Sequence, residues 1–285
     1  MIQFDWAAPE TLAEAVGLLD PEDQSIRPIA GGTALMLMMK AGVFAPSRLV
    51  SLGRIEPRYS NISVDRDGSL RIGAMVSLSQ LERSAEMAKR FGVMKRALRT
   101  LSNVRVRNVA RVGGALAHGD PHMDLPPLLA ALGARVSVTG ASGTREIAVE
   151  NLYAGYYETT LEKNELIAEA IVPPLDGAKA AYMKVTSRSA DDWPALNIGV
   201  RLETDGAKQI REVRLVISAA TEKVTRLTGT EALLKGAVAD DATLKRAGES
   251  AAAEVSFLSD AHGSAAYKRE LLRVYLGRVI REALS

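Results

Sequence analysis

Two pairs of adjacent glycines, Gly31-Gly32 and Gly113-Gly114, constrain the fold of this chain more than any other feature of its sequence. Each pair follows an apolar stretch and precedes small residues. Glycine lets the backbone turn sharply and bring its N–H groups close to a ligand, so each pair suits a tight, anion-binding turn. Neither pair matches G-x-G-x-x-G or the Walker pattern, which argues against a Rossmann or P-loop fold. Two such turns in separate units are suited to gripping a diphosphate from both sides.

Length and composition bound the class of protein. A chain of 285 residues is long for a single core and indicates two or three subdomains. The formal net charge of +2 gives no global field for binding polyanions. No apolar run approaches the roughly 18–20 residues that span a bilayer, and the start of the chain lacks the signal-peptide pattern. We therefore expect no membrane span and a cytoplasmic protein.

Cysteine is absent from the sequence. This excludes disulfides, cysteine-ligated zinc, iron–sulfur clusters and a thiol nucleophile on this chain. No G-x-S-x-G elbow is present either.

Hydrophobic periodicity predicts an α+β protein in three units. A helix over 10–20, a strand near 26–29, a helix over 35–39 and a strand over 48–52 form a first unit, about 1–55. A hairpin over 61–76, helices within 76–101 and strands within 134–150 and 165–174 form a second unit, about 56–176, which ends at the Pro-Pro-Leu-Asp-Gly linker, 173–177. Strands within 180–188 and 196–219 and helices over 240–255 and 264–284 form the third unit, 177–285. The stripe Leu271, Leu272, Tyr275, Val279 and Ile280 is predicted to be core.

The segment His118, Asp120, His122 and Asp124 has the composition of a metal site. Gly119 and Pro121 disfavour the continuous helix that would align the two histidines, although an irregular loop remains able to gather the ligands. The favoured interpretation has the histidines bonded locally and Asp124 capping the next helix.

A basic stretch holds Lys95, Arg96, Arg99, Arg105, Arg107 and Arg111. No helix-turn-helix or RNA-binding signature accompanies it, so a solvated face or a docking surface for a partner chain is favoured over nucleic-acid binding.

Three stretches together resemble the FAD-binding medium subunit of the xanthine oxidase family of molybdenum hydroxylases, in the style of the carbon monoxide dehydrogenase medium chain. They are "IAGGTALMLMMKAG", "SNVRVRNVARVGGALAHGDPHMDLPPLLAALGA" and "YMKVTSRSADDWPALNIGV", and the resemblance covers nearly the whole chain. It implies a two-part vanillyl-alcohol-oxidase-type FAD-binding domain, 1–176, followed by a C-terminal flavoprotein domain, 177–285.

The resemblance also implies which residues hold FAD. The two glycine loops cradle the diphosphate, while other positions flank the cofactor or, for Trp193, lie near the isoalloxazine. The implied set is Pro28, Ile29, Ala30, Gly31, Gly32, Thr33, Ala34, Leu35, Leu101, Arg111, Val112, Gly113, Gly114, Ala115, Asp124, Ile167, Lys184 and Trp193. Relatives usually carry Thr or Ser at Arg111, Ser or Asn at Ala115, and Asp or Ser at Ala34, so the chain departs from the family there. No catalytic or metal-ligating residue is implied on this chain.

The function that the resemblance implies is electron transfer in an oxidoreductase complex. Such a subunit takes electrons from [2Fe–2S] clusters on a small partner chain and passes them to an external acceptor, while the molybdenum cofactor lies on a large partner chain. A dimer of heterotrimers is expected, with no nucleic acid. A stand-alone FAD oxidoreductase of this fold and an FAD-free scaffold remain as alternatives. The substrate and the acceptor do not follow from the sequence.

Overall fold

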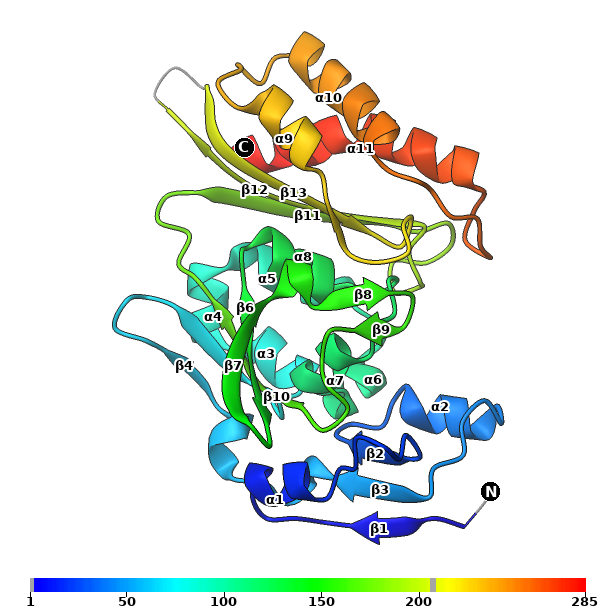
Figure 1. The fold of residues 1–285 in the computed structure, drawn as a ribbon. Helices are drawn as coiled ribbons and strands as arrows, with labels where there is room; N and C mark the ends of the chain where they lie inside the picture. The colour runs from blue at the N-terminus through cyan, green and yellow to red at the C-terminus, as the bar shows by residue number, and fades with distance from the viewer. Residues whose placement is uncertain (1–2, 206–208) are drawn as a thin grey trace.

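The computed structural model describes residues 3–205 and 209–285 and shows three sheets stacked along the length of the molecule, each with its own helices (Figure 1). The chain is mixed α+β, as predicted. The part of the predicted strand segment 196–219 at residues 206–208 lies outside the described residues. None of the helices in the described chain is long and apolar enough to cross a membrane.

The first sheet is small and parallel, with β3 between the other two strands: β1 (Asp5–Ala7), β3 (Arg48–Ser51) and β2 (Ile26–Ile29). The helices are α1 (Leu12–Gly17) and α2 (Leu35–Lys40). Thr11 and Glu14 form a capping box that starts α1, and the predicted apolar face of this helix is buried. The chain then runs through the 3₁₀ turns η1 (Leu52–Arg54) and η2 (Pro57–Ser60).

The second sheet has five antiparallel strands, in the order β4 (Ile62–Val64), β5 (Leu70–Gly73), β10 (Leu166–Val172), β6 (Arg135–Gly140) and β7 (Gly143–Ala148). Its helices are α3 (Leu78–Arg83), α4 (Ala85–Arg90), α5 (Gly92–Thr100), α6 (Val104–Val109), α7 (Val112–Ala117) and α8 (Leu125–Ala131). After η3 (Val149–Asn151), a short ladder pairs β8 (Tyr153–Gly155) with β9 (Glu158–Thr159). Gly68 adopts a φ of +87° in the hairpin turn that the sequence predicts.

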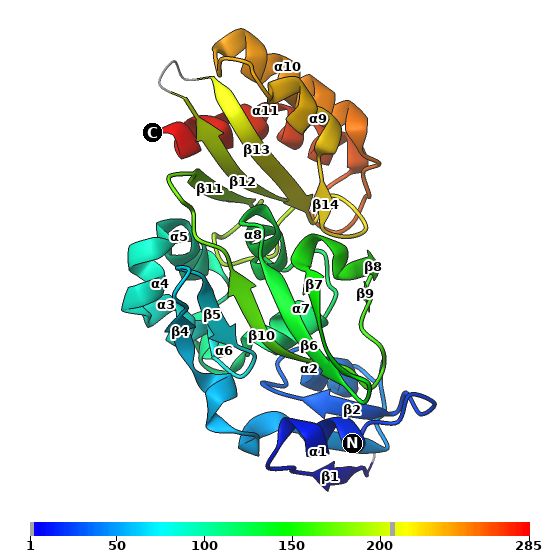
Figure 2. The same ribbon diagram turned by 60° about the vertical axis from the view of Figure 1, so that its left-hand side comes forward.

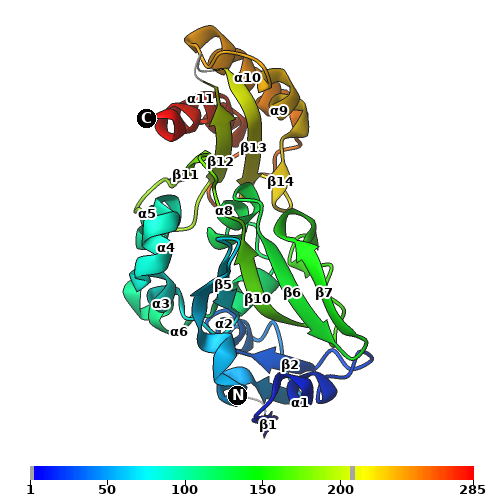
Figure 3. The same ribbon diagram turned by 90° about the vertical axis from the view of Figure 1, so that its left-hand side faces the viewer.

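The third sheet is antiparallel, in the order β11 (Lys179–Val185), β12 (Leu196–Thr204), β13 (Ile210–Ser218) and β14 (Thr225–Arg226). It is accompanied by α9 (Thr228–Leu234), α10 (Asp241–Glu254) and α11 (Ala265–Leu284). Helix α11 covers one face of the sheet, and α8 and α5 pack on the other (Figures 2 and 3). The predicted stripe of α11 lies in this core, with Tyr275 partly buried at its edge.

Helix α8 joins the second and third units. All seven of its residues are buried, because it lies between the core of the second sheet and the open face of the third. Gly199 on β12 allows the close approach: a Cβ atom there would lie 2.7 Å from the Cβ of Ala131 and 3.0 Å from the carbonyl oxygen of Pro127.

This packing predicts the effect of Gly199→Ala. The added methyl group would force α8 away from β12, so we expect a loss of about 1–3 kcal/mol in the free energy of unfolding, measured by denaturant titration. Gly17→Ala is the control, because a Cβ there meets nothing within 4 Å. That change should leave stability equal or higher. Equal effects of the two substitutions would contradict the role assigned to Gly199.

Candidate functional site

The first glycine loop connects the end of β2 to the start of α2. Gly32 has a φ of +68°, a conformation that glycine adopts without strain. In the part of the chain that the structure describes, no acceptor pairs with the amides of Gly31, Gly32, Thr33 or Ala34. The loop is only half-buried. Four successive unpaired N–H groups supply what an anion-binding backbone nest requires.

The second glycine pair does not form the turn that the sequence predicts. Gly113 and Gly114 lie in the first turn of α7, and neither has a positive φ. The amides of Val112 and Gly113 donate to Val76 and Ala74 at 3.0 and 2.8 Å. The Gly114 amide has no acceptor among the described residues. An unpaired amide at the start of a helix is also suited to an anion.

The two glycine segments abut, although they are far apart in the sequence. A Cβ at Gly31 would lie 2.3 Å from the carbonyl oxygen of Val109, so only glycine allows the first loop to press against the chain before α7. A Cβ at Gly114 would meet only the Cβ of Ala30, at 3.9 Å. The space beside Gly114 therefore opens toward the first loop.

Arg111 precedes α7 and has an unsatisfied donor. Its Nε atom is buried and has no hydrogen-bond partner in the structure. A buried guanidinium donor without a partner is costly unless an anion binds it. Arg111 is the residue before α7 and Gly114 lies in the first turn of that helix, so the residues present at this helix start fit an anionic group.

Asp124 holds the residue position before α8 but does not cap that helix, so this prediction was wrong. Its backbone is helical and its side chain bonds no helix amide. The reason can be read in the sequence: a cap accepts from the second or third helical amide, and these positions are Pro126 and Pro127, which have no N–H. The carboxylate accepts instead from the Tyr182 hydroxyl at 2.9 Å and from Lys184 Nζ at 3.1 Å.

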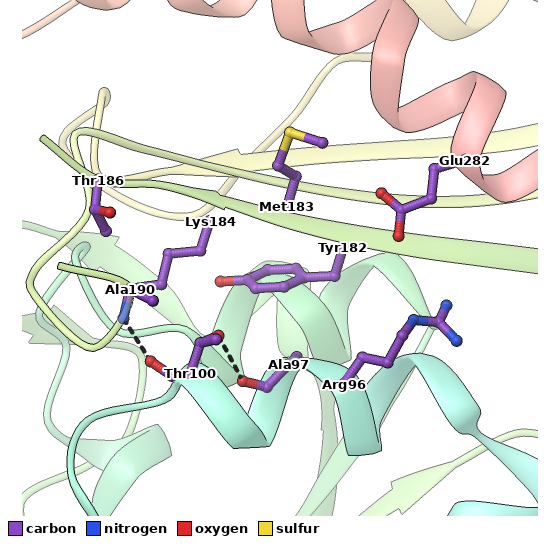
Figure 4. Close-up of a pocket in the computed structure, with 9 residues that line it drawn as sticks. All are labelled: Arg96, Ala97, Thr100, Tyr182, Met183, Lys184, Thr186, Ala190 and Glu282. Carbon is purple, nitrogen blue, oxygen red and sulfur yellow. Dashed lines mark hydrogen bonds between the residues drawn. The ribbon is translucent and has the colours of Figure 1, made fainter.

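Lys184 and Asp124 form a buried ion pair between the second and third units. Lys184 Nζ also donates to the carbonyl of Thr100, at 3.0 Å (Figure 4). Burial raises the pKa of Asp124 and is opposed by the Lys184 charge, and burial with the Asp124 charge raises the pKa of Tyr182. Tyr182 and Lys184, but not Asp124, border a cavity of about 280 Å³ between α5 and β11. It is lined by Arg96, Ala97, Thr100, Tyr182, Met183, Lys184, Thr186, Ala190 and Glu282.

The remaining predicted residues lie in three places. Pro28 and Ile29 end β2, next to the first loop, and Leu35 begins α2. Leu101 is buried at the C-terminal end of α5, Ile167 is buried in β10, and Val112 and Ala115 are buried in α7, which packs on β10. Trp193 is 45% exposed in the segment between β11 and β12. Ile167 is near the second glycine segment, because its neighbour Ala168 accepts from the Ala74 amide and the Ala74 carbonyl accepts from the Gly113 amide.

Sequence reasoning missed Tyr182 and Asp260. Tyr182 had a signal, because residues i and i+2 of a strand share a face and Lys184 was already a candidate. Asp260 had none: its carboxylate lies 2.9 Å from His122 Nε2, across 138 residues of sequence. His122 Nδ1 lies 2.9 Å from Asp120, so the local hydrogen bond predicted for His122 is present. The His118 ring, for which the same was predicted, has no hydrogen bond in the described structure and packs edge-on against Tyr157. Within the described ranges, no group of three or more His, Asp or Glu residues has a metal-binding arrangement.

Comparison with known proteins covers the whole chain. The family described as FAD binding domain in molybdopterin dehydrogenase matches residues 2–175, and the CO dehydrogenase flavoprotein C-terminal domain matches residues 181–283. The glyceraldehyde dehydrogenase medium chain of Sulfolobus acidocaldarius is 29% identical over 98% of both chains. The carbon monoxide dehydrogenase medium chain of Afipia carboxidovorans is 31% identical, over 98% of this chain and 96% of its own.

Solved structures agree with these relatives. Carbon monoxide dehydrogenase from Hydrogenophaga pseudoflava contains a chain that superposes with a TM-score of 0.94 at 29% identity, over 100% of this chain and 99% of that one. Quinoline 2-oxidoreductase from Pseudomonas putida 86 gives 0.91 at 27% identity, over 99% and 97%.

The buried pair predicts the effect of Lys184→Met. Removing the cation strands the Asp124 charge, so we expect a loss of about 3–5 kcal/mol in the free energy of unfolding. The double variant Asp124→Asn/Lys184→Met removes both charges and should cost less than the sum of the single variants, measured in a double-mutant cycle. Additive losses would show that the two groups do not interact.

Proposed function

The chain belongs to the FAD-binding medium subunits of the xanthine oxidase family of molybdenum hydroxylases, and on that premise we propose how its own residues hold and serve the cofactor. FAD accepts electrons singly and releases them in pairs, which is the chemistry it supplies to such a complex. The chain has no cysteine, so [2Fe–2S] clusters must reside on another polypeptide. This subunit therefore acts as an oxidoreductase component that binds and orients the flavin.

The observation that carries the assignment is the set of unpaired donors at the two abutting glycine segments. The amides of Gly31, Gly32, Thr33 and Ala34 on one side face no protein acceptor, and the Gly114 amide and Arg111 Nε on the other side have none among the described residues. We assign the FAD diphosphate to this group of donors. The negative charge of the diphosphate is then stabilised by the dipole of α7, by backbone N–H groups and by one guanidinium.

The isoalloxazine end is assigned to the junction of the second and third units. Leu101, Asp124 and Lys184 border this junction, whereas Ile167 lies at the end of β10 nearer the first unit, where its neighbours Leu166 and Ala168 pack in the core of that unit. Trp193 contributes a large, half-exposed aromatic plane from the segment after β11. A ring in that position shields the flavin from water and lies on the side that an acceptor approaches.

The assembly is also a proposal. Relatives are named as medium chains and subunits of multi-component enzymes, which supports a large molybdenum-cofactor chain and a small [2Fe–2S] chain as partners here, in a dimer of heterotrimers. A cytoplasmic location accords with the absence of cysteine. We further propose domain limits near residues 55 and 176.

The first test is the flavin content of Gly114→Val. The purified complex should release intact, non-covalent FAD on heating or acid treatment, since no cysteine exists for thioether attachment. A valine side chain at position 114 fills the space toward Ala30, so we expect at least a tenfold loss of FAD affinity, about 1.4 kcal/mol.

Chromatography of the released flavin measures this loss, and Gly17→Val is the control because its site is open and remote. Full flavin content in Gly114→Val, with assembly intact, would refute the assignment of the second segment. Release of FMN alone, or no flavin from the assembled wild-type complex, would refute the proposed cofactor site as a whole.

The second test concerns Trp193→Ala. Loss of the indole should change the rate of reduced-flavin reoxidation by about two- to tenfold, the scale of one aromatic contact. Reduction of the complex by its substrate should be unaffected, because that chemistry lies on another chain. Stopped-flow measurement of the two half-reactions separates the effects. The control is Trp6→Ala, the other tryptophan, which is 58% exposed on β1. Wild-type reoxidation in Trp193→Ala would return this residue to a packing role.

A further inference from the structure

His122 lies between two carboxylates that come from different parts of the fold. Its Nδ1 atom is 2.9 Å from Asp120 Oδ1, in the segment between α7 and α8, and its Nε2 atom is 2.9 Å from Asp260 Oδ2, between α10 and α11. The ring is 7% exposed. The imidazole thus bridges the FAD-binding part of the chain and the C-terminal part.

The hydrogen bonds fix the protonation state of the ring. An ionised carboxylate can only accept, so each ring nitrogen that faces one must donate. Neutral imidazole has a single N–H and would leave its other nitrogen lone pair against a carboxylate oxygen. Two carboxylate partners, one on each ring nitrogen, therefore favour the imidazolium form.

Both carboxylates are themselves anchored. Asp120 Oδ2 accepts from the Tyr157 hydroxyl at 2.8 Å, and Asp260 Oδ2 also accepts from Lys268 Nζ. Lys268 is fully buried and donates to the Ala219 carbonyl at 2.8 Å as well. Burial opposes ionisation of Asp260, but the bonds from Lys268 and His122 lower its pKa to about 2. The ring is consequently held from both sides by fixed negative charges.

The free edge of this cluster meets Trp193. The rings of His122 and Trp193 are 6.0 Å apart between centroids and perpendicular. The hydrogen bonds that hold the segment around Trp193 are at its surface. The Trp193 amide donates to the carboxylate of Asp192, and Asp192 forms an ion pair with Arg188. Since an exposed ion pair holds a segment weakly, the His122 ring is the rigid surface against which the indole rests.

We propose that His122 is a positioning residue for electron transfer out of the flavin: as an imidazolium held between Asp120 and Asp260, it holds the Trp193 indole in place, and it releases the indole when it loses its proton. This inference rests on the proposed function, in which Trp193 covers the acceptor-facing side of the flavin. It concerns the residue that orients Trp193, not the residues that bind FAD.

The direction of the pH effect follows from the charges around the ring. Burial would lower the pKa of His122, but the hydrogen bonds and charges of Asp120 and Asp260 raise it above the ordinary value of 6.5. A raised pKa means that the clamp is complete below pH 6.5 and is lost as the pH rises through the folded-state pKa. The charged and titratable groups that face the cluster among the described residues are His118, Asp120, Tyr156, Tyr157, Asp192, Asp260, His262 and Lys268.

The first experiment needs no flavin chemistry. In the full chain carrying Trp6→Phe, Trp193 is the sole tryptophan, and an adjacent imidazolium quenches indole emission. We expect the emission to rise in a single step as the pH passes through a midpoint above 6.5. His122→Gln, which keeps hydrogen-bonding capacity without titrating, should abolish the step. His262→Gln should retain it, because the His262 ring, 5.2 Å from His122, has no hydrogen bond in the described structure. A wild-type midpoint below 6.5, or a step that survives in His122→Gln, would overturn the proposal.

The second experiment links the cluster to electron transfer in the assembled complex, with dioxygen as the acceptor probe. Reoxidation of reduced flavin should accelerate about two- to tenfold as the pH rises through the same midpoint. His122→Gln should be pH-independent over this range, and the double variant His122→Gln/Trp193→Ala should match Trp193→Ala alone. Additive effects of the two substitutions would overturn the positioning role.

The two experiments separate the possible failures. A fluorescence step without any change in reoxidation would mean that His122 holds Trp193 but that Trp193 does not cover the flavin, so the assignment of Trp193 would fail. A pH-dependent reoxidation rate that persists in His122→Gln would contradict the role of His122 and leave the flavin site intact. ¹⁵N NMR of the His122 ring in the wild-type chain checks the protonation state without any substitution: both nitrogens should be protonated at pH 6.

Discussion

Residues 120–124, a short segment without regular structure, connect the second glycine segment to helix α8 and, through their hydrogen bonds, to the third unit. Each of the last four makes a bond across the junction. The Pro121 carbonyl accepts from the Ala219 amide at 2.8 Å and the Met123 carbonyl from Asn197 at 3.4 Å, while the His122 and Asp124 side chains pair with Asp260 and Lys184. Because this segment follows α7 directly and leads into α8, the unpaired donors near Gly114 and the third sheet are held in a fixed relation. The FAD site that we propose, which spans both ends, depends on that relation.

Buried ion pairs cross the junction between the second and third units. Lys184 is a buried ammonium group that pairs across the junction with Asp124 and the Thr100 carbonyl. Lys268, buried within the third unit, bonds the Ala219 carbonyl and Asp260, and it is Asp260 that pairs with His122 across the junction. Burying such pairs costs desolvation energy that the Coulomb attraction barely repays, so their contribution to net stability is small. Such pairs require a definite geometry, because displacement of one partner leaves the other charge buried and unpaired. We interpret the pairs as devices that select one arrangement of the two parts, and α8, packed on both sides, supplies the apolar burial.

The features that the sequence could predict are those set by residues close together along the chain. The strands, the hairpin turn at Gly68 and the stripe on α11 follow from periodicity and turn residues, which act within a few positions along the chain. Residues in contact across the fold escape such reasoning, and the bond between His122 and Asp260 spans 138 residues without any pattern to indicate it. Two errors were of another kind. Gly113 was predicted to turn the chain, but it lies in a helix and is small because a Cβ there would come within 2.7 Å of the Ala74 Cβ. Asp124 was predicted to be a cap although the prolines after it have no amide to offer, a fact already present in the sequence.

Two of the three positions at which the sequence departs from the pattern that the resemblance implies, Arg111 and Ala115, lie at the second glycine segment. Alanine at position 115 gives up a side-chain hydroxyl or amide, and that residue is buried in α7, so no side-chain polar group of its own points to a ligand. Arginine at position 111 brings a formal charge instead, with a buried Nε atom that no protein group satisfies. A charged donor forms stronger hydrogen bonds with a phosphate oxygen than a neutral hydroxyl does. In the site that we propose, backbone amides make the other contacts with the diphosphate and do not depend on side-chain identity, so we propose that the Arg111 guanidinium takes the place of the missing hydroxyls.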